Sequence, residues 1–192
     1  MKSVKKHYSL IILTILSILA VNQSLTAQSA LSPQDRKTMT DFESQAKDYS
    51  RLRESLEEKL PKLPKDATAD QIEAHKMTFQ KMVQQARVNA RQGDIFTPAA
   101  AQLIRTIIKE EFKGKDRAEL RKTVLEAENK DVPVKVNSPY PDSKEQIEMP
   151  PTLLLNLPQL PKQLRYRFVG TNLLLLDREN GLIVDYLTNA LP

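Results

Sequence analysis

The chain has 192 residues, of which 28% are charged and 40% hydrophobic, and its formal net charge is +5 at pH 7. It contains no cysteine, which excludes disulfide bonds, thiol catalysis, zinc ribbons and iron–sulfur clusters. The length suits one ordinary domain, or two small ones that share a boundary.

Residues 1–27 predict a secretory signal. Three lysines precede the apolar run "LIILTILSILAV", and the polar stretch "NQSLTAQSA" follows it. The apolar run is shorter than the roughly 20 residues that a membrane-spanning helix needs. We therefore expect an exported protein, periplasmic or extracellular, cleaved after Ala27 or after Ser29. An uncleaved N-terminal anchor is the alternative.

Removal of the signal lowers the charge. The remaining chain has 26 basic against 24 acidic residues, a net charge of +2, because three of the 29 Lys and Arg lie in the signal. These charges are interleaved along the chain rather than clustered. We expect no nucleic-acid partner and no stable membrane insertion after signal cleavage.

Residues 28–131 predict about four helices. Proline follows a capping residue at Ser32 and Thr97, and capping boxes begin at Thr68 and Asp116. The expected helices run over 33–60, 68–93, 97–114 and 116–128. Apolar residues spaced by three and four form one stripe on each helix. The stripe of the first helix is Met39, Phe42, Ala46, Tyr49, Leu52, Leu56 and Leu60, and that of the second is Ile72, His75, Phe79, Met82 or Val83, Ala86 and Ala90. The stripe of the third helix is Ile104, Ile107, Ile108 and Phe112, and that of the fourth is Leu120, Val124 and Leu125. We predict a helical bundle, or a helix hairpin with two shorter helices packed on it.

Residues 132–192 form a Pro- and Leu-rich β region. "VPVKVN" predicts a short edge strand, and "LRYRFVG", "LLLLD" and "LIVDYL" predict a three-stranded antiparallel meander. A left-handed Gly181 would set Leu176 opposite Val184 and Leu174 opposite Tyr186. The meander should have one apolar face that the helices cover, so the fold class is α+β in one body. "PPTLLLNLP" is either one helical turn or extended chain.

A Leu-Pro phrase occurs twice, as "LPKLPK" at 60–65 and "LPQLPK" at 157–162. In the polyproline II conformation its leucines share one edge. We favour a stiff connector that lays these leucines on the core, because both copies sit between strongly patterned elements. The alternative is a ligand for an SH3-like groove.

His75 is the only histidine outside the signal. A serine triad would need it as the base, but no "GxSxG" elbow is present. A zinc site would need carboxylates in place of missing His and Cys ligands. We read His75 as a boundary residue packed on the first helix, with a ligand or catalytic role as the alternative.

Asp185 is a carboxylate within the apolar run "LIVDYL". It should pair with Arg165 or Arg167 across the sheet, and a perturbed functional acid is the alternative. "DRENG" at 177–181 lacks the glutamate and glycine spacing of a calcium loop, so we predict a hairpin turn there.

Two loops are candidate binding segments. "QGDIFTP" contains Asp94, and its backbone amides could hold an anion or be satisfied by Thr97. "VNSPYP" presents Asn137 and Tyr140 on a rigid loop suited to recognition. No catalytic set, metal site or cofactor motif is predicted.

The phrases "LPKLPK", "QIEAH", "QGDIFTP", "VNSPYP", "PPTLLLNLPQLPK", "YRFVG" and "LIVDYL" together resemble a family of uncharacterised bacterial secreted proteins. The resemblance spans nearly all of the chain after the signal. It implies export, a charged helical half and a Leu/Pro-rich second half, and it implies no catalytic or binding residue.

Three functions follow from these features, in order of preference. The first is an exported non-enzymatic protein that binds a protein or an envelope component through its helical half, with a homodimer as a further form. The second is a small-ligand or metal-binding periplasmic protein that uses the five residues His75, Asp94, Asn137, Tyr140 and Asp185. The third is an atypical hydrolase.

Overall fold

The computed structural model describes residues 31–113, 118–126, 132–141 and 149–191. The predicted signal, its cleavage sites and the predicted box at Asp116 lie outside these residues. The chain separates into two units, 1–32 and 33–192, and all secondary structure described below belongs to the second. Within the described residues, no helix combines the length and the apolar character that crossing a membrane requires.

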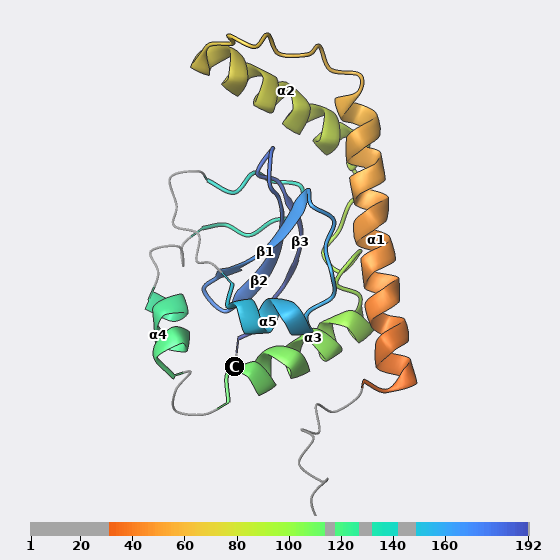
Figure 1. Ribbon diagram of the computed structural model, residues 1–192, viewed down its shortest axis with the longest axis vertical. Helices are drawn as coiled ribbons and strands as arrows, with labels where there is room; N and C mark the ends of the chain where they lie inside the picture. The colour runs from red at the N-terminus through yellow and green to blue at the C-terminus, as the bar shows by residue number, and fades with distance from the viewer. Residues whose placement is uncertain (1–30, 114–117, 127–131, 142–148, 192) are drawn as a thin grey trace, which may run out of the picture. The chain divides into compact units, whose positions relative to one another are not determined.

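The second unit contains helices and a three-stranded antiparallel sheet, which confirms the predicted mixed helix-and-strand composition (Figure 1). The elements are α1 Pro33–Glu57, α2 Ala69–Ala86, α3 Pro98–Glu111, α4 Ala118–Glu126, α5 Pro151–Asn156, β1 Leu164–Val169, β2 Asn172–Asp177 and β3 Ile183–Leu187.

Helix starts follow the sequence signals. Thr68 and Gln71 form the predicted capping box, with the Thr68 amide donating to Gln71 Oε1 at 2.9 Å. Thr97 caps α3 just ahead of Pro98. Pro150 and Pro151 open the short helix α5, which resolves the ambiguous stretch in favour of a helix.

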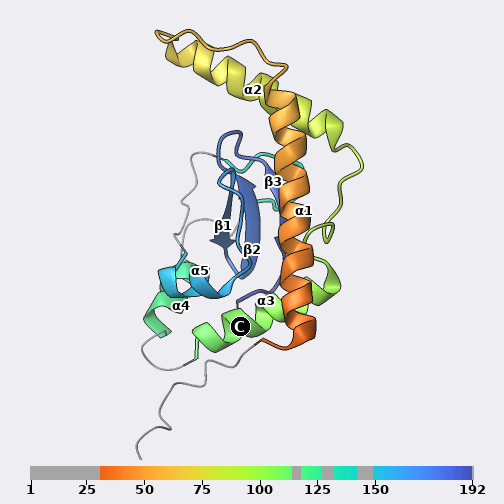
Figure 2. The same cartoon turned by 45° about the vertical axis from the view of Figure 1, so that its right-hand side comes forward.

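The helices do not form the predicted four-helix bundle. The described residues contain five: α1 packs against α2 and α3, α3 against α5, and α4 against β1. Their apolar stripes instead cover one face of the sheet, as when Phe42 of α1 meets Tyr166 of β1 at a ring-centroid distance of 6.3 Å. Figures 1 and 2 show α1 running alongside the sheet, with α2 at one end of α1 and α3 at the other.

The strands follow the order β1-β2-β3 as a meander. Leu174 lies opposite Tyr186, as predicted, and Gly181 has the predicted positive φ, at 70°. Leu176 lies opposite Ile183 rather than Val184, because the register shifts between Leu175 and Leu176. The bulge adds one residue to β3 that the sequence pattern does not reveal.

Both faces of the sheet are buried, so the prediction of a single apolar face is wrong. Leu173 and Leu175 join the helix-side core, whereas Leu174 and Leu176 pack with Val132 and its neighbours on the other side. The unbroken "LLLL" of β2 is the pattern of a strand buried on both faces.

The predicted strand "VPVKVN" is not a strand. The chain joins the sheet at the end of this segment, where an isolated bridge pairs Pro139 with Leu182. The amides of Asn137 and Tyr140 donate to the carbonyls of Ile183 and Gly181, at 2.8 and 2.9 Å. This segment therefore covers the open edge of β3.

The two Leu-Pro phrases differ in burial. In the second, Leu157 is buried and Leu160 packs on the core, as the connector prediction requires. In the first, Leu60 is buried but Leu63 is 38% exposed. The first phrase therefore lies only partly on the core.

Candidate functional site

Asp185 of β3 is fully buried and binds backbone amides on both carboxylate oxygens. Oδ2 accepts from Ile95 and Phe96 at 2.8 Å each, and Oδ1 accepts from Gly93 at 3.0 Å and from Tyr186 at 2.8 Å. The "QGDIF" loop thus forms a nest of donors, and the anion that fills it is this chain's own side chain.

The predicted pairing of Asp185 with Arg165 or Arg167 is wrong. β1 and β3 lie on opposite sides of β2, and Asp185 shares its sheet face with Leu175, whereas Arg165 lies opposite Leu176. Burial raises the pKa of Asp185, and the four backbone hydrogen bonds oppose that rise. The carboxylate acts as an anchor between β3 and the loop before α3.

Asn137 is a second anchor. Its Nδ2 donates to the carbonyls of Gln84 and Arg87 at 2.9 and 3.2 Å, and its φ is 65°. Gln84 returns a hydrogen bond to the Asn137 carbonyl at 3.0 Å. Because the last carbonyls of a helix lack internal partners, Asn137 ties the end of α2 to the edge of β3.

The other three predicted site residues lie apart from one another. Tyr140 is buried within the second core. Asp94 is exposed and its Oδ2 accepts from the Arg91 amide at 2.8 Å, inside the loop that Asp185 holds. His75, on α2, lies 3.1 Å from the Pro61 carbonyl. The structure places Asp94, Asn137 and Asp185 along β3, with Tyr140 at the turn that precedes it, and leaves His75 outside this group.

A buried polar cluster that the sequence did not predict links α1 to the β2–β3 turn. Asp177 Oδ2 accepts from the Tyr49 hydroxyl at 2.8 Å and from Arg53 Nε at 3.0 Å. Asp177 and Arg53 are 0% and 3% exposed, and Arg53 also pairs with Glu57 and Glu179. The guanidinium lies over the Phe79 ring, 5.0 Å from its centroid.

The sequence feature that could have predicted this cluster is the position of Arg53 in α1. It lies four residues after Tyr49 and seven after Ala46, on the inward stripe, where a charge needs a buried partner. Asp177 Oδ1 also accepts from the amides of Glu179 and Asn180, which gives the hairpin turn predicted for "DRENG". Asp177 thus accepts four hydrogen bonds, and Arg53 is the shared partner of three carboxylates.

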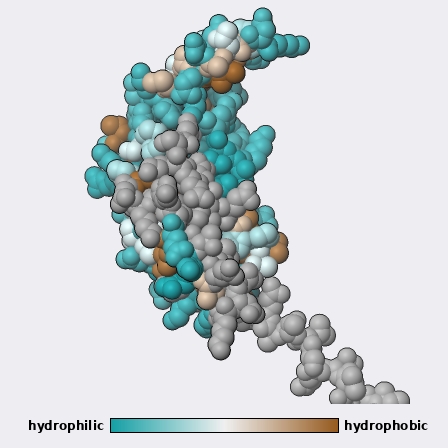
Figure 3. All heavy atoms as spheres, turned by 90° about the vertical axis from the view of Figure 1, so that its left-hand side faces the viewer, coloured by the Kyte–Doolittle hydropathy of each residue, from teal (hydrophilic) through white to brown (hydrophobic). Residues whose placement is uncertain are grey.

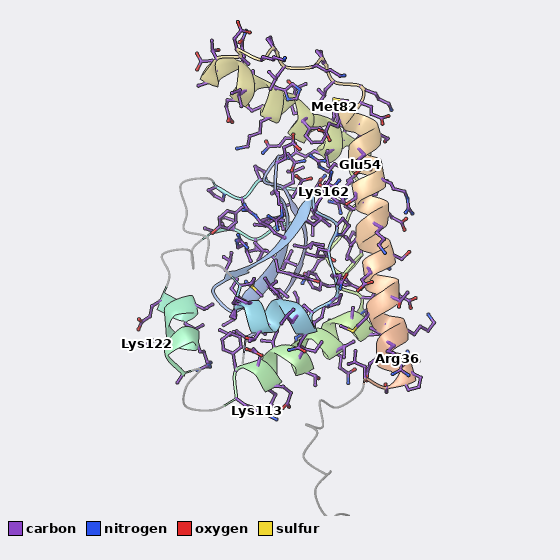
Figure 4. All side chains as sticks on the ribbon, in the orientation of Figure 1. Arg36, Glu54, Met82, Lys113, Lys122 and Lys162 are labelled. Atoms are coloured by element: carbon purple, nitrogen blue, oxygen red, sulfur yellow. The ribbon has the colours of Figure 1, made fainter. Side chains whose placement is uncertain are left out.

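A groove of about 470 Å³ lies where α1 ends. Leu60, Pro61 and Leu63 form its apolar part, and Glu54, Glu57, Glu58, Lys62 and His75 its polar part. Glu54, labelled in Figure 4, lies on α1 near this end. Among the described residues, no group of His, Asp and Glu has an arrangement that could hold a metal ion.

Comparisons of the chain with known protein families, with curated proteins and with solved structures gave no match. The resemblance to secreted bacterial proteins therefore stays a prediction, and the candidate function rests on the geometry alone.

Proposed function

We propose that this is an exported, non-enzymatic binding protein that takes a partner protein at the free end of its α1–α2 hairpin. We call this end the arm and define it as residues 54–77. Export rests on the N-terminal sequence pattern. The binding role rests on the exposed apolar surface of the arm.

One observation supports this role above the others. Between residues 54 and 77 only Leu60 is buried, whereas Leu63, Ile72 and Met77 are 38%, 51% and 47% exposed. Ile72 lies seven residues before the buried Phe79, on the same face of α2. The apolar stripe of α2 therefore packs on the core at Phe79 but is exposed to solvent at Ile72.

Ile72 belongs to the first turn of α2, which begins at Ala69. In Figures 1 and 2 the first turns of α2 extend away from the sheet, with the preceding segment looping beyond them. Figure 3 shows tan and brown atoms among teal ones at this upper end. Apolar side chains with a charged surround are typical of protein-binding surfaces.

The groove beside these residues has the same character. Its leucines and proline lie between charged side chains of both signs, which would give a partner an apolar contact with a polar rim. The fully bonded anchors Asp177 and Asp185 lie elsewhere, within the body, and are already occupied by this chain's own donors.

Site-specific photocrosslinking in the native host tests the proposal. A photoreactive residue at Ile72 or Met77 should give one and the same discrete protein adduct. The matched control is Leu155 of α5, which is 85% exposed but lies outside the arm, and it should give none.

A charge placed in the arm tests the contact itself. Ile72→Asp should lower the adduct formed at Met77 about tenfold, because a charge at a buried contact removes most of its affinity. Leu155→Asp should leave that adduct unchanged. No adduct from either arm position, or the same adducts from Leu155, would contradict the proposal.

A further inference from the structure

A separate cavity of about 320 Å³ lies at the start of β1, away from the arm residues that form the first groove. The second Leu-Pro phrase forms one wall, with Leu160 and Pro161. The charged residues in its lining are Lys162, Arg165, Arg167 and Arg178, and among the described residues no carboxylate lines it.

The fold brings these cations together from two segments. Arg165 and Arg167 alternate with the core residues of β1, so both lie on the same face, about 7 Å apart along the strand. Arg178 follows β2 and reaches β1 because its amide donates to the Gln163 carbonyl at 2.8 Å. Lys162 precedes β1, and Figure 4 labels it at that end of the strand.

Hydrogen bonds orient two of the guanidinium groups. Arg178 Nε donates to the Leu164 carbonyl at 3.0 Å, and Arg167 Nη1 donates to the Tyr166 carbonyl at 2.9 Å. The terminal nitrogens of Arg178 have no hydrogen-bond partner in the described part of the chain. An arginine held through Nε presents both terminal nitrogens as a fork, which suits two oxygens of one oxyanion.

Several acidic side chains lie near the cavity, and each has a hydrogen-bond or ion-pair partner. Glu43 accepts a hydrogen bond from the amide of the lining residue Gln159 at 2.9 Å. A neighbouring groove shares Lys162 and Arg178, and its acidic lining residues are Glu54, Glu57 and Glu179. Glu179 pairs with Arg53, and Glu54 accepts a hydrogen bond from Gln163. Neither Lys162 nor Arg178 forms an ion pair within the described residues.

We propose that this cavity binds a phosphate group, carried either by a small soluble ester or by a lipid headgroup. A dianion matches several fixed cations better than a single carboxylate does, and charge-assisted bonds from arginine to phosphate are short and two-pronged. The volume lies at the small end of the range for ligand pockets. None of the residues that line the cavity belongs to the arm, and the neighbouring groove joins the two through Glu54 and Glu57.

Calorimetric titration of the full chain with phenyl phosphate at low salt tests this site. The wild type should bind, and Arg178→Gln should weaken binding about tenfold, the effect of losing one strong charge-assisted contact. The double change Lys162→Gln with Arg178→Gln should remove measurable binding. Arg91→Gln and Lys47→Gln are the matched controls, since both residues are exposed and lie outside the cavity.

The outcomes separate specific from general electrostatic binding. No binding, equal binding by the double variant, or equal losses in the control variants would overturn the proposal. Succinate binding more tightly than phenyl phosphate would also overturn it. Thermal unfolding of each variant shows whether it is folded, and because Lys162 and Arg178 are exposed, we expect both changes to leave the melting temperature nearly unchanged.

Vesicles distinguish the two sources of phosphate. Binding to phosphatidylglycerol vesicles but not to phosphatidylcholine vesicles, lost in the double variant, would support the site and assign the phosphate to a lipid headgroup. Binding of phenyl phosphate without any vesicle binding would support the site and assign it to a soluble ester.

Discussion

The β2–β3 hairpin and the arm differ in the burial of their side chains and in the contacts that these side chains make. In the hairpin, Asp177 and Asp185 are fully buried, and both accept several hydrogen bonds from distant parts of the chain. In the arm, one residue of 54–77 is buried, and apolar side chains meet solvent. Buried charge in the hairpin indicates structural anchoring, and the exposed apolar surface of the arm is the basis of the proposed binding role.

The difference explains why the most conspicuous polar residues are poor candidates for function. A buried carboxylate that already accepts backbone amides has few remaining sites for a ligand, and displacing its partners would expose unpaired donors. The apolar side chains of the arm could instead contact a partner without breaking buried contacts, because only one residue of 54–77 is buried. In the proposed account, the residues that stabilise the fold and those that bind a partner therefore lie in different parts of the chain.

The largest expected effect is a loss of folding stability on removal of the buried Arg53 side chain. Arg53→Ala should lower the free energy of unfolding by about 3–5 kcal/mol, because it leaves Asp177 buried without its cation. Chemical denaturation of the variant measures the loss. A loss below about 1 kcal/mol would mean that Tyr49 and the turn amides alone satisfy Asp177, and the contrast between the two regions would weaken.

Asp185→Asn should cost about 2–3 kcal/mol, because the amide group would set its own N–H donors against backbone donors of the 93–96 loop. Asp94→Asn is the control in the same loop. The Asp94 side chain is exposed and accepts a hydrogen bond from the Arg91 amide, so Asp94→Asn should cost less. If chemical denaturation gave both variants the same loss of unfolding free energy, the loss would not depend on the burial of Asp185, and this prediction would be wrong.

Asn137→Ala should cost about 2 kcal/mol, and Asn137→Gly about half as much. Both lose the bonds to the α2 carbonyls, but only alanine is strained at a φ of 65°. Thermal or chemical unfolding of the pair gives the difference. If the two variants were equally stable, backbone strain would contribute nothing at this position.

The smallest effect should be in the arm. Ile72→Ala should change the free energy of unfolding by no more than about 0.5 kcal/mol. Phe79→Ala, on the same face of α2 but 1% exposed, should cost about 3–5 kcal/mol. Comparable losses would mean that Ile72 is packed in the folded protein, which would remove the basis for a binding surface there.

Local patterns predicted much of the fold. The capping residues Thr68 and Thr97 located two helix starts, the alternation of "LRYRF" identified β1, and Gly181 identified the turn between β2 and β3. These features depend on neighbouring residues, so a sequence displays them directly. The bulge after Leu175 depends instead on the pairing of two strands, and no local pattern marks it.

The roles of single polar residues were harder to predict. Asp185 was expected to meet an arginine, but its partners are amides of a loop about 90 positions earlier in the chain. Arg53 carried a usable signal, since a charge on an inward stripe requires a buried acid. Which acid it meets depends on how α1 lies against the sheet, and the stripe itself does not contain that information.

Hydrogen exchange followed by mass spectrometry on the free protein tests the central contrast most directly. Peptides from 61–77 should exchange their amides much faster than those from 172–187, because the arm has few buried contacts and opens without unfolding the body. Equal protection in both regions would contradict this account, since it would show the arm to be as firmly integrated as the hairpin.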